Sequence, residues 1–216
     1  MNQPRDRLIK QLTADLPSVS VVRAGTATTA LWLGFSTVLV ALLTLAVQPF
    51  RPGFEEQLLE VPRFALETVI GVIAIALTGT AGLKSAIPGS NAPGLTRWAV
   101  AATALWLSSY VAGLYIPTLE STMVGKRPHC ALETLLYSAP ALVVGIWIAG
   151  RRYVLNWPRT AVTIAVTAGG IPAFLMQLAC MYGARHILLT HFAPVLLVAT
   201  LGLFIGLILQ HRSNHP

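Results

Sequence analysis

The feature that most constrains this chain is a series of long apolar runs that carry almost no charge. A helix that spans a membrane needs about 20 mostly apolar residues, and the sequence holds six such runs. The runs are Thr28–Val47, Phe64–Ala86, Trp98–Ile116, Ala131–Gly150, Thr160–Cys180 and Phe192–Gln210. Their apolar residues are continuous, which favours helices over the alternating pattern of an outer-membrane barrel. Only short connections are left, so no separate soluble domain fits between the runs.

Composition also indicates an integral membrane protein. Of the 216 residues, 55% are hydrophobic and 11% are charged, and the mean hydropathy is +0.67. Soluble domains carry about 25% charged residues, so a soluble globular domain is excluded, and so is a charge-rich disordered chain. The 2 cysteines are too few for a secreted disulfide scaffold. We therefore predict an all-α, polytopic membrane bundle of six transmembrane helices.

The distribution of basic residues predicts how this bundle sits in the lipid bilayer. Lys and Arg favour cytoplasmic loops, and 10 of the 15 fall on the inner side if the N-terminus is inside. Both termini are then expected in the cytoplasm. The net charge of +7 is mainly a topology signal, and no direct contact with nucleic acid is expected without a folded basic domain. The expected parts are a cytoplasmic N-terminal segment (1–26), a transmembrane domain (27–210) and a cytoplasmic tail (211–216).

The two cysteines are the main candidates for chemistry. Cys130 lies just before the fourth run and Cys180 ends the fifth, so the predicted topology places both at the outer face. Disulfides persist in the oxidising bacterial periplasm, and two cysteines can pair if their Cα atoms come within about 7 Å. The alternative is a pair of inert thiols, because free cysteine packs as a small hydrophobe.

Histidines are expected at the same outer face. Cysteine and histidine are typical ligands of zinc and of other soft or borderline metals. The spacing matches no recognised metal signature, and an interfacial side chain in water is the alternative for each histidine. The candidate ligands of a transient metal ion are Cys130, Cys180, His129, His186 and His191.

Two carboxylates near the outer ends of their runs have two possible environments. Glu67 and Glu133 lie at the membrane edge rather than at its centre. They are either solvated or directed into the bundle interior, where intramembrane charges usually face.

The N-terminal segment carries a short amphipathic pattern. Leu8, Ile9, Leu12 and Leu16 recur at helical spacing, and Pro17 ends the pattern. A helix of about 10 residues is marginal alone in water, so a membrane surface or a partner's groove is needed to order it. Both interpretations remain open from the residues alone.

No enzyme motif is present in the sequence, and we do not expect an enzyme. There is no P-loop, Rossmann glycine fingerprint, GxSxG or HExxH motif. A membrane thiol oxidoreductase stays as an alternative, although such enzymes more often use CxxC or two cysteine pairs. A small metal or solute transporter is another, although it would need polar or charged groups in mid-span.

Several short features together resemble one family. They are the Leu-Ile-x-x-Leu-x-x-Asp-Leu start at Leu8–Leu16, Cys130, Pro140-Ala141-Leu142, Arg151-Arg152, Cys180, His191 and Pro194-Val195. With the length and the number of runs, they make the chain resemble the NrsF-like family. These proteins are six-span inner-membrane anti-sigma factors of bacteria that act on extracytoplasmic-function sigma factors. Residues 181–185 depart from the family, being less acidic and poorer in small polar residues than expected.

The resemblance implies a mechanism. The N-terminal segment would hold the sigma factor at the inner membrane, away from RNA polymerase, through Leu8, Ile9, Leu12 and Leu16. Cys130 and Cys180 would sense oxidative or heavy-metal stress and trigger release. No permanent cofactor is implied, and a metal signal would use the same two thiolates.

Overall fold

A computed structural model describes residues 3–14, 25–90, 93–120 and 123–214, and every regular element in these ranges is helical. The elements are α1 (Gln3–Ala14), α2 (Thr26–Val47), α3 (Phe54–Glu60), α4 (Pro62–Ser85), α5 (Pro93–Gly113), α6 (Cys130–Gly150), α7 (Trp157–Ala179), α8 (Ala184–Ile187), the π-helical turn η1 (Leu188–Phe192) and α9 (Ala193–Asn214).

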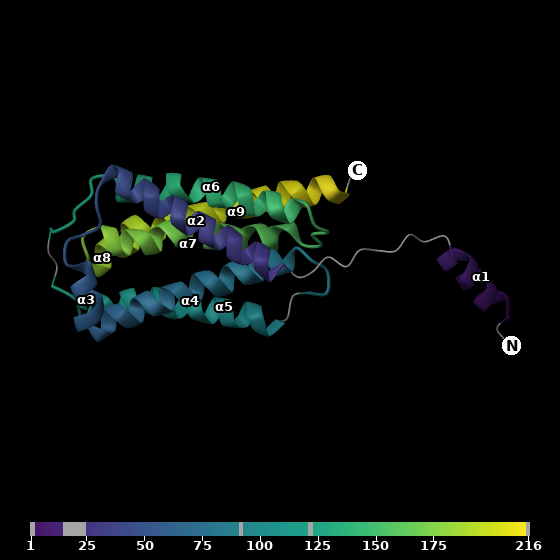
Figure 1. The fold of residues 1–216 in the computed structure, drawn as a ribbon, viewed down its shortest axis with the longest axis horizontal. Coiled ribbons are helices and arrows are strands. Elements are labelled where there is room, and N and C mark those ends of the chain that lie inside the picture. The colour runs from purple at the N-terminus through teal and green to yellow at the C-terminus, as the bar shows by residue number, and fades with distance from the viewer. Residues whose placement is uncertain (1–2, 15–24, 91–92, 121–122, 215–216) are drawn as a thin grey trace.

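The long helices form a bundle in which α7 occupies the centre. It packs against α2, α4, α6 and α9, whereas α5 lies on the outside against α4. Helix α2 begins and α9 ends at one end of the bundle, and α3 and α8 lie at the other (Figure 1). We call the end that holds α3 and α8 the cysteine end, because α6 begins there with Cys130 and α7 ends there just before Cys180.

Five helical segments are long and apolar enough to cross a membrane. They are α2, α4, α6, α7 and the continuous stretch Ala184–Ser213. These five confirm the corresponding apolar runs as helices of spanning length. The run predicted at Trp98–Ile116 folds into helix α5 but is not one of the five, so the sixth span stays a prediction, as does the orientation.

The starts of three helices, α3, α4 and α7, have a local cause. Proline lacks a backbone N–H and is tolerated in the first turn, where that donor has no partner, and α4 begins at Pro62. Helix α7 is capped by Asn156, whose Oδ1 accepts a hydrogen bond of 3.0 Å from the backbone N–H of Arg159. Gly53 precedes α3 with a φ of 76°, a left-handed conformation that glycine adopts without steric cost.

One tryptophan connects α2 to α6 in the core. The indole Nε1 of Trp32 donates a hydrogen bond of 3.0 Å to the carbonyl of Ala141. Gly145 gives the ring its space, because a Cβ at that position would lie 2.8 Å from Cζ2 of Trp32. A buried indole N–H normally needs such a partner, so this bond fixes α2 against α6.

Candidate functional site

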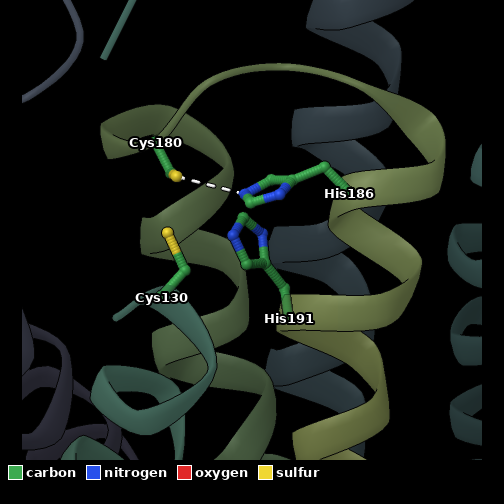
Figure 2. A group of neighbouring side chains, drawn as sticks. All are labelled: Cys130, Cys180, His186 and His191. Carbon is green, nitrogen blue, oxygen red and sulfur yellow. Dashed lines mark hydrogen bonds between the residues drawn. The ribbon is translucent and has the colours of Figure 1, made fainter. Parts of the chain in front are cut away.

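Four of the five predicted metal-ligand residues meet at the cysteine end. Cys130 is the first residue of α6, Cys180 follows α7, His186 lies in α8 and His191 in η1 (Figure 2). One ligand atom from each lies within 4.8 Å of the others. His129 is exposed and lies outside this group, which we call the Cys–His cluster.

The chain returns sharply over Cys180 to bring the histidines in. Cys180 has an extended backbone, and α8 begins at Ala184 after a short connection. His191 then lies in a π-helical turn. Pro194 follows and has no N–H to donate to the carbonyl of Thr190, which disfavours regular α-helix here. Isolated π-turns are frequent at functional sites, and this one directs His191 toward the two cysteines.

Three of the four residues of the cluster are buried, and the two cysteines are not joined by a disulfide. Cys130 is 3% exposed, and Cys180 and His191 are 0% exposed. The Sγ atom of Cys180 lies 3.2 Å from Nε2 of His186. The two imidazole rings meet edge to face, with centroids 5.2 Å apart. Neither ring nitrogen of His191 makes a well-formed hydrogen bond within the described ranges of the chain, although the ring lies close enough to the Cys180 thiol to influence it.

The surroundings of Cys180 favour its thiolate. Interactions with Cys130, His186 and His191 lower the pKa of Cys180 by more than burial raises it. A lowered pKa raises the fraction of thiolate, which is both the nucleophile and the metal ligand. A thiolate at Cys180 has the chemistry of a nucleophile or a metal ligand.

A buried arginine fixes the backbone at Cys180. Nη1 of Arg51 donates a hydrogen bond of 3.2 Å to the carbonyl of Cys180, and Nη2 donates one of 2.7 Å to Gln57. The guanidinium lies 5.5 Å and 5.7 Å from the ring centroids of Phe64 and Tyr182. Burial lowers the pKa of Arg51. The segment before α3 is thereby attached to the end of α7.

An ion pair fixes the chain at Cys130. Nη1 of Arg127 lies 2.8 Å from Oε2 of Glu133, and both side chains are buried. Nη2 of Arg127 donates to the carbonyls of Thr44 (3.0 Å) and Gln48 at the end of α2. The carbonyl of Arg127 lies 3.5 Å from Sγ of Cys130. The pair thus connects the start of α6 and Cys130 to α2.

A second carboxylate is buried on the other side of the same end. Glu67 accepts hydrogen bonds from Arg63 (3.3 Å), Thr118 (2.9 Å) and the hydroxyl of Tyr182. Burial and this bond raise the pKa of Tyr182. Glu67 and Glu133 therefore face the bundle interior, which decides between the two environments considered for them.

An open groove gives access to the cluster. It measures about 840 Å³ and its lining includes Glu120, Tyr182, His186 and Thr190. His186 is half-buried, and it belongs both to the groove lining and to the cluster. A small ion or oxidant that enters the groove meets His186, and Cys180 lies buried behind it, 3.2 Å from Nε2 of His186.

The predicted N-terminal helix is present as α1, and its apolar stripe is uncovered. Leu8, Ile9 and Leu12 are 55%, 48% and 64% exposed. Leu16, the fourth residue predicted in the stripe, lies outside the described residues. The exposed stripe is free for a partner or a membrane surface.

Sequence reasoning missed the arginines that build the cysteine end. In the sequence, Arg51, Arg63 and Arg127 belong to the five basic residues that the charge rule leaves on the outer side. In the structure Arg51 and Arg127 are buried and Arg63 is partly buried, and all three donate to acceptors of neighbouring segments. The sequence signal that could have identified these arginines is their position on the outer side, against the preference of basic residues for cytoplasmic loops.

Comparison with known protein families gives a match over most of the chain. A family model described as "Negative regulator of sigma F", NrsF, matches residues 12–210. The matched region contains the whole Cys–His cluster and every helix from α2 to α8. No curated protein and no solved structure matches the chain.

Proposed function

The chain belongs to the NrsF family of negative regulators of sigma F, and from this premise we propose that it is an inner-membrane anti-sigma factor. It sequesters an extracytoplasmic-function sigma factor through its cytoplasmic N-terminal segment. Oxidative or heavy-metal stress acts on Cys130 and Cys180 and releases the sigma factor. The match over residues 12–210 is the observation that carries this proposal.

The uncovered stripe on α1 supports sigma binding. Burying a leucine or isoleucine side chain in a partner contributes roughly 1.5–3 kcal/mol. Leu8, Ile9 and Leu12 together offer enough apolar surface for a specific helix-in-groove contact.

The Cys–His cluster supports sensing by the thiols. Peroxide would oxidise the pair by the reaction 2 R–SH + H2O2 → R–S–S–R + 2 H2O. The two Sγ atoms, now within 4.8 Å, would approach to about 2.05 Å, which draws the start of α6 toward the end of α7. Soft metal ions would compete for the same thiolates. Exchange with a protein dithiol requires sulfur–sulfur contact, and the burial of both cysteines makes the oxidoreductase alternative weaker.

Helix α7 is the connection by which a change at the cluster would reach the other end. Its 23 residues extend about 34 Å, and they pack against α2, whose first turn follows the N-terminal segment. Coupling between distant sites is typically about 1–3 kcal/mol, or roughly 5–150-fold in affinity. That is enough to release a bound sigma factor.

Co-purification from native membranes tests the sigma-binding part. The tagged full-length chain should retain a sigma factor, identified by mass spectrometry. The variant Leu8→Asp/Leu12→Asp should lose it, because charge replaces the apolar contact. Gln11→Asp/Ala14→Asp adds the same two charges elsewhere on α1 and should retain it. Retention by both variants, or by neither, would contradict α1 as the interface.

The same assay tests the cysteines. Peroxide or cadmium added to cells should lower sigma retention by the wild type. The Cys130→Ser/Cys180→Ser variant should give the same retention with and without the stress. A variant that still releases the sigma factor under stress would remove the pair from the sensing mechanism.

A further inference from the structure

The strongest unexplained feature of the molecule is His191. Its side chain is completely buried, and in the part of the chain that the structure describes neither ring nitrogen makes a well-formed hydrogen bond, with the Cys180 thiol as its nearby neighbour. Leaving a buried polar group without a hydrogen-bond partner destabilises the folded protein. The ring is therefore available to a ligand, and the groups it faces are Cys130, Cys180 and His186 (Figure 2).

We propose that Cys130, Cys180, His186 and His191 form a tetrahedral site for one Zn²⁺ ion in the unstressed protein. Two cysteines and two histidines are a typical donor set for structural zinc, which takes four protein ligands and no substrate. The two thiolates balance the charge of the ion, so the occupied site is neutral and can remain buried.

The geometry fits this assignment after a small contraction. Zinc binds sulfur at about 2.3 Å and nitrogen at about 2.0–2.1 Å, so ligand atoms in a tetrahedron lie about 3.3–3.8 Å apart. Cys180 and His186 are already 3.2 Å apart, and all four ligand atoms lie within 4.8 Å of one another. Movements of about 1 Å in the side chains would complete the tetrahedron.

The surrounding contacts hold the ligands in place. Arg51 fixes the carbonyl of Cys180, and the carbonyl of Arg127 lies against Cys130. The ion would connect the start of α6, the end of α7 and the α8–η1 segment. The half-buried side of His186 faces the groove, which supplies a route for the metal.

Zinc and the disulfide would exclude each other, because both use the same two sulfur atoms. Oxidation of the occupied site balances as 2 R–S⁻ + H2O2 + 2 H⁺ → R–S–S–R + 2 H2O, with release of Zn²⁺. The zinc-bound protein would thus be the form that holds the sigma factor. This regulatory role rests on the proposed function, whereas metal binding itself does not.

Metal titration of the full-length protein in detergent tests the site. Chelator-treated wild type should bind one Zn²⁺ per chain, and Co²⁺ in its place should show a sulfur-to-cobalt charge-transfer band. His186→Ala and His191→Ala should weaken zinc binding by roughly 10–100-fold or more. His129→Ala, which removes an exposed neighbour outside the cluster, should bind as the wild type does.

A further variant distinguishes the loss of a zinc ligand from a loss of folding. His191→Cys keeps a ligand at the same position, so it should retain zinc and strengthen the cobalt charge-transfer band. Less than one zinc per wild-type chain, binding of Cd²⁺ or Cu⁺ but not zinc, or wild-type affinity in both alanine variants would overturn the zinc site. Sigma retention is measured on the same preparations. A chain that holds the sigma factor without zinc refutes only this inference, and one that holds zinc without the sigma factor refutes only the proposed function.

Discussion

Arg127 and Glu133 carry opposite charges in a part of the molecule from which water is largely excluded. The guanidinium uses one nitrogen for the carboxylate and the other for carbonyls at the end of α2. A buried charge that loses its partner is strongly destabilising, whereas removal of both charges often costs little. This asymmetry makes the pair a sensitive test of the cysteine end.

We expect Glu133→Gln to destabilise the protein by about 3–5 kcal/mol, because it leaves the charge of Arg127 buried without its partner. The double variant Arg127→Met/Glu133→Leu should be more stable than Glu133→Gln alone. Unfolding in detergent, followed by the circular dichroism of the helices, measures both. Equal stability of Glu133→Gln and the wild type would show that the pair is solvated.

The sequence gives part of this site and not the rest. The ends of the predicted spans place Cys130 and Cys180 at the same depth in the membrane. The oxidising periplasm expected on that side favours a functional cysteine pair. Membrane depth alone does not show which helix faces are in contact. It therefore does not distinguish His186 and His191, which lie beside the cysteines, from His129, which is exposed. That separation depends on the π-turn and on the return of the chain after Cys180.

At the scale of elements, the irregular stretch before α9 decides where His191 points. An alanine at position 194 would supply the N–H that the carbonyl of Thr190 lacks and would favour a regular α-helix. Loss of the extra residue in the π-turn would rotate the preceding segment by about 100°, the angle per residue of a 3.6-residue turn.

Pro194→Ala should therefore turn His191 away from the cysteines. If the zinc site exists, zinc affinity should fall while helix content stays unchanged. Competition with a chelating dye and circular dichroism give the two readouts. Val195→Ala is a suitable neighbouring control and should keep wild-type affinity. Unchanged affinity in Pro194→Ala would mean that the proline does not set the position of His191.

Helices α7 and α9 approach closely where glycine lies between them. A Cβ on Gly206 would lie 2.6 Å from Cα of Pro158 and 2.8 Å from the carbonyl oxygen of Trp157. Small residues commonly allow membrane helices to pack at such short distances. Because the obstructing atoms are backbone, the helices themselves would have to separate.

We expect Gly206→Ala to destabilise the bundle by about 1–3 kcal/mol through overpacking. Gly34→Ala in α2 is the matched control, because a Cβ there meets nothing within 4 Å. Thermal unfolding of the two variants in the same detergent compares them. A loss of stability in the Gly34 variant of the same size would attribute the effect to glycine replacement in general.

At the scale of the whole molecule, the number of spans fixes which loops face the cytoplasm. Helix α5 lies along α4, and its 21 residues extend about 32 Å, enough to cross the bilayer. Its hydroxyl groups lower its hydropathy, yet Thr103, Ser108 and Ser109 donate to carbonyls of the same helix. Hydroxyls satisfied in this way are tolerated in a membrane. A hydropathy scale counts the polarity of these hydroxyl groups but not the hydrogen bonds that satisfy them. We therefore favour α5 as a sixth span.

Labelling of single cysteines in a Cys130→Ser/Cys180→Ser background decides between six and five spans. Pro88, Met123 and Tyr153 are exposed in three successive connections, between α4 and α5, α5 and α6, and α6 and α7. With six spans and an inner N-terminus, a membrane-impermeant maleimide should label Met123→Cys in intact cells. Pro88→Cys and Tyr153→Cys should react only after permeabilisation. If α5 does not cross, the last two connections exchange sides, so that Tyr153→Cys is labelled from outside and Met123→Cys is protected. Because Arg51, in the connection between α2 and α4, hydrogen-bonds the carbonyl of Cys180, that second pattern would contradict both the six-span topology and the packing of the cysteine end.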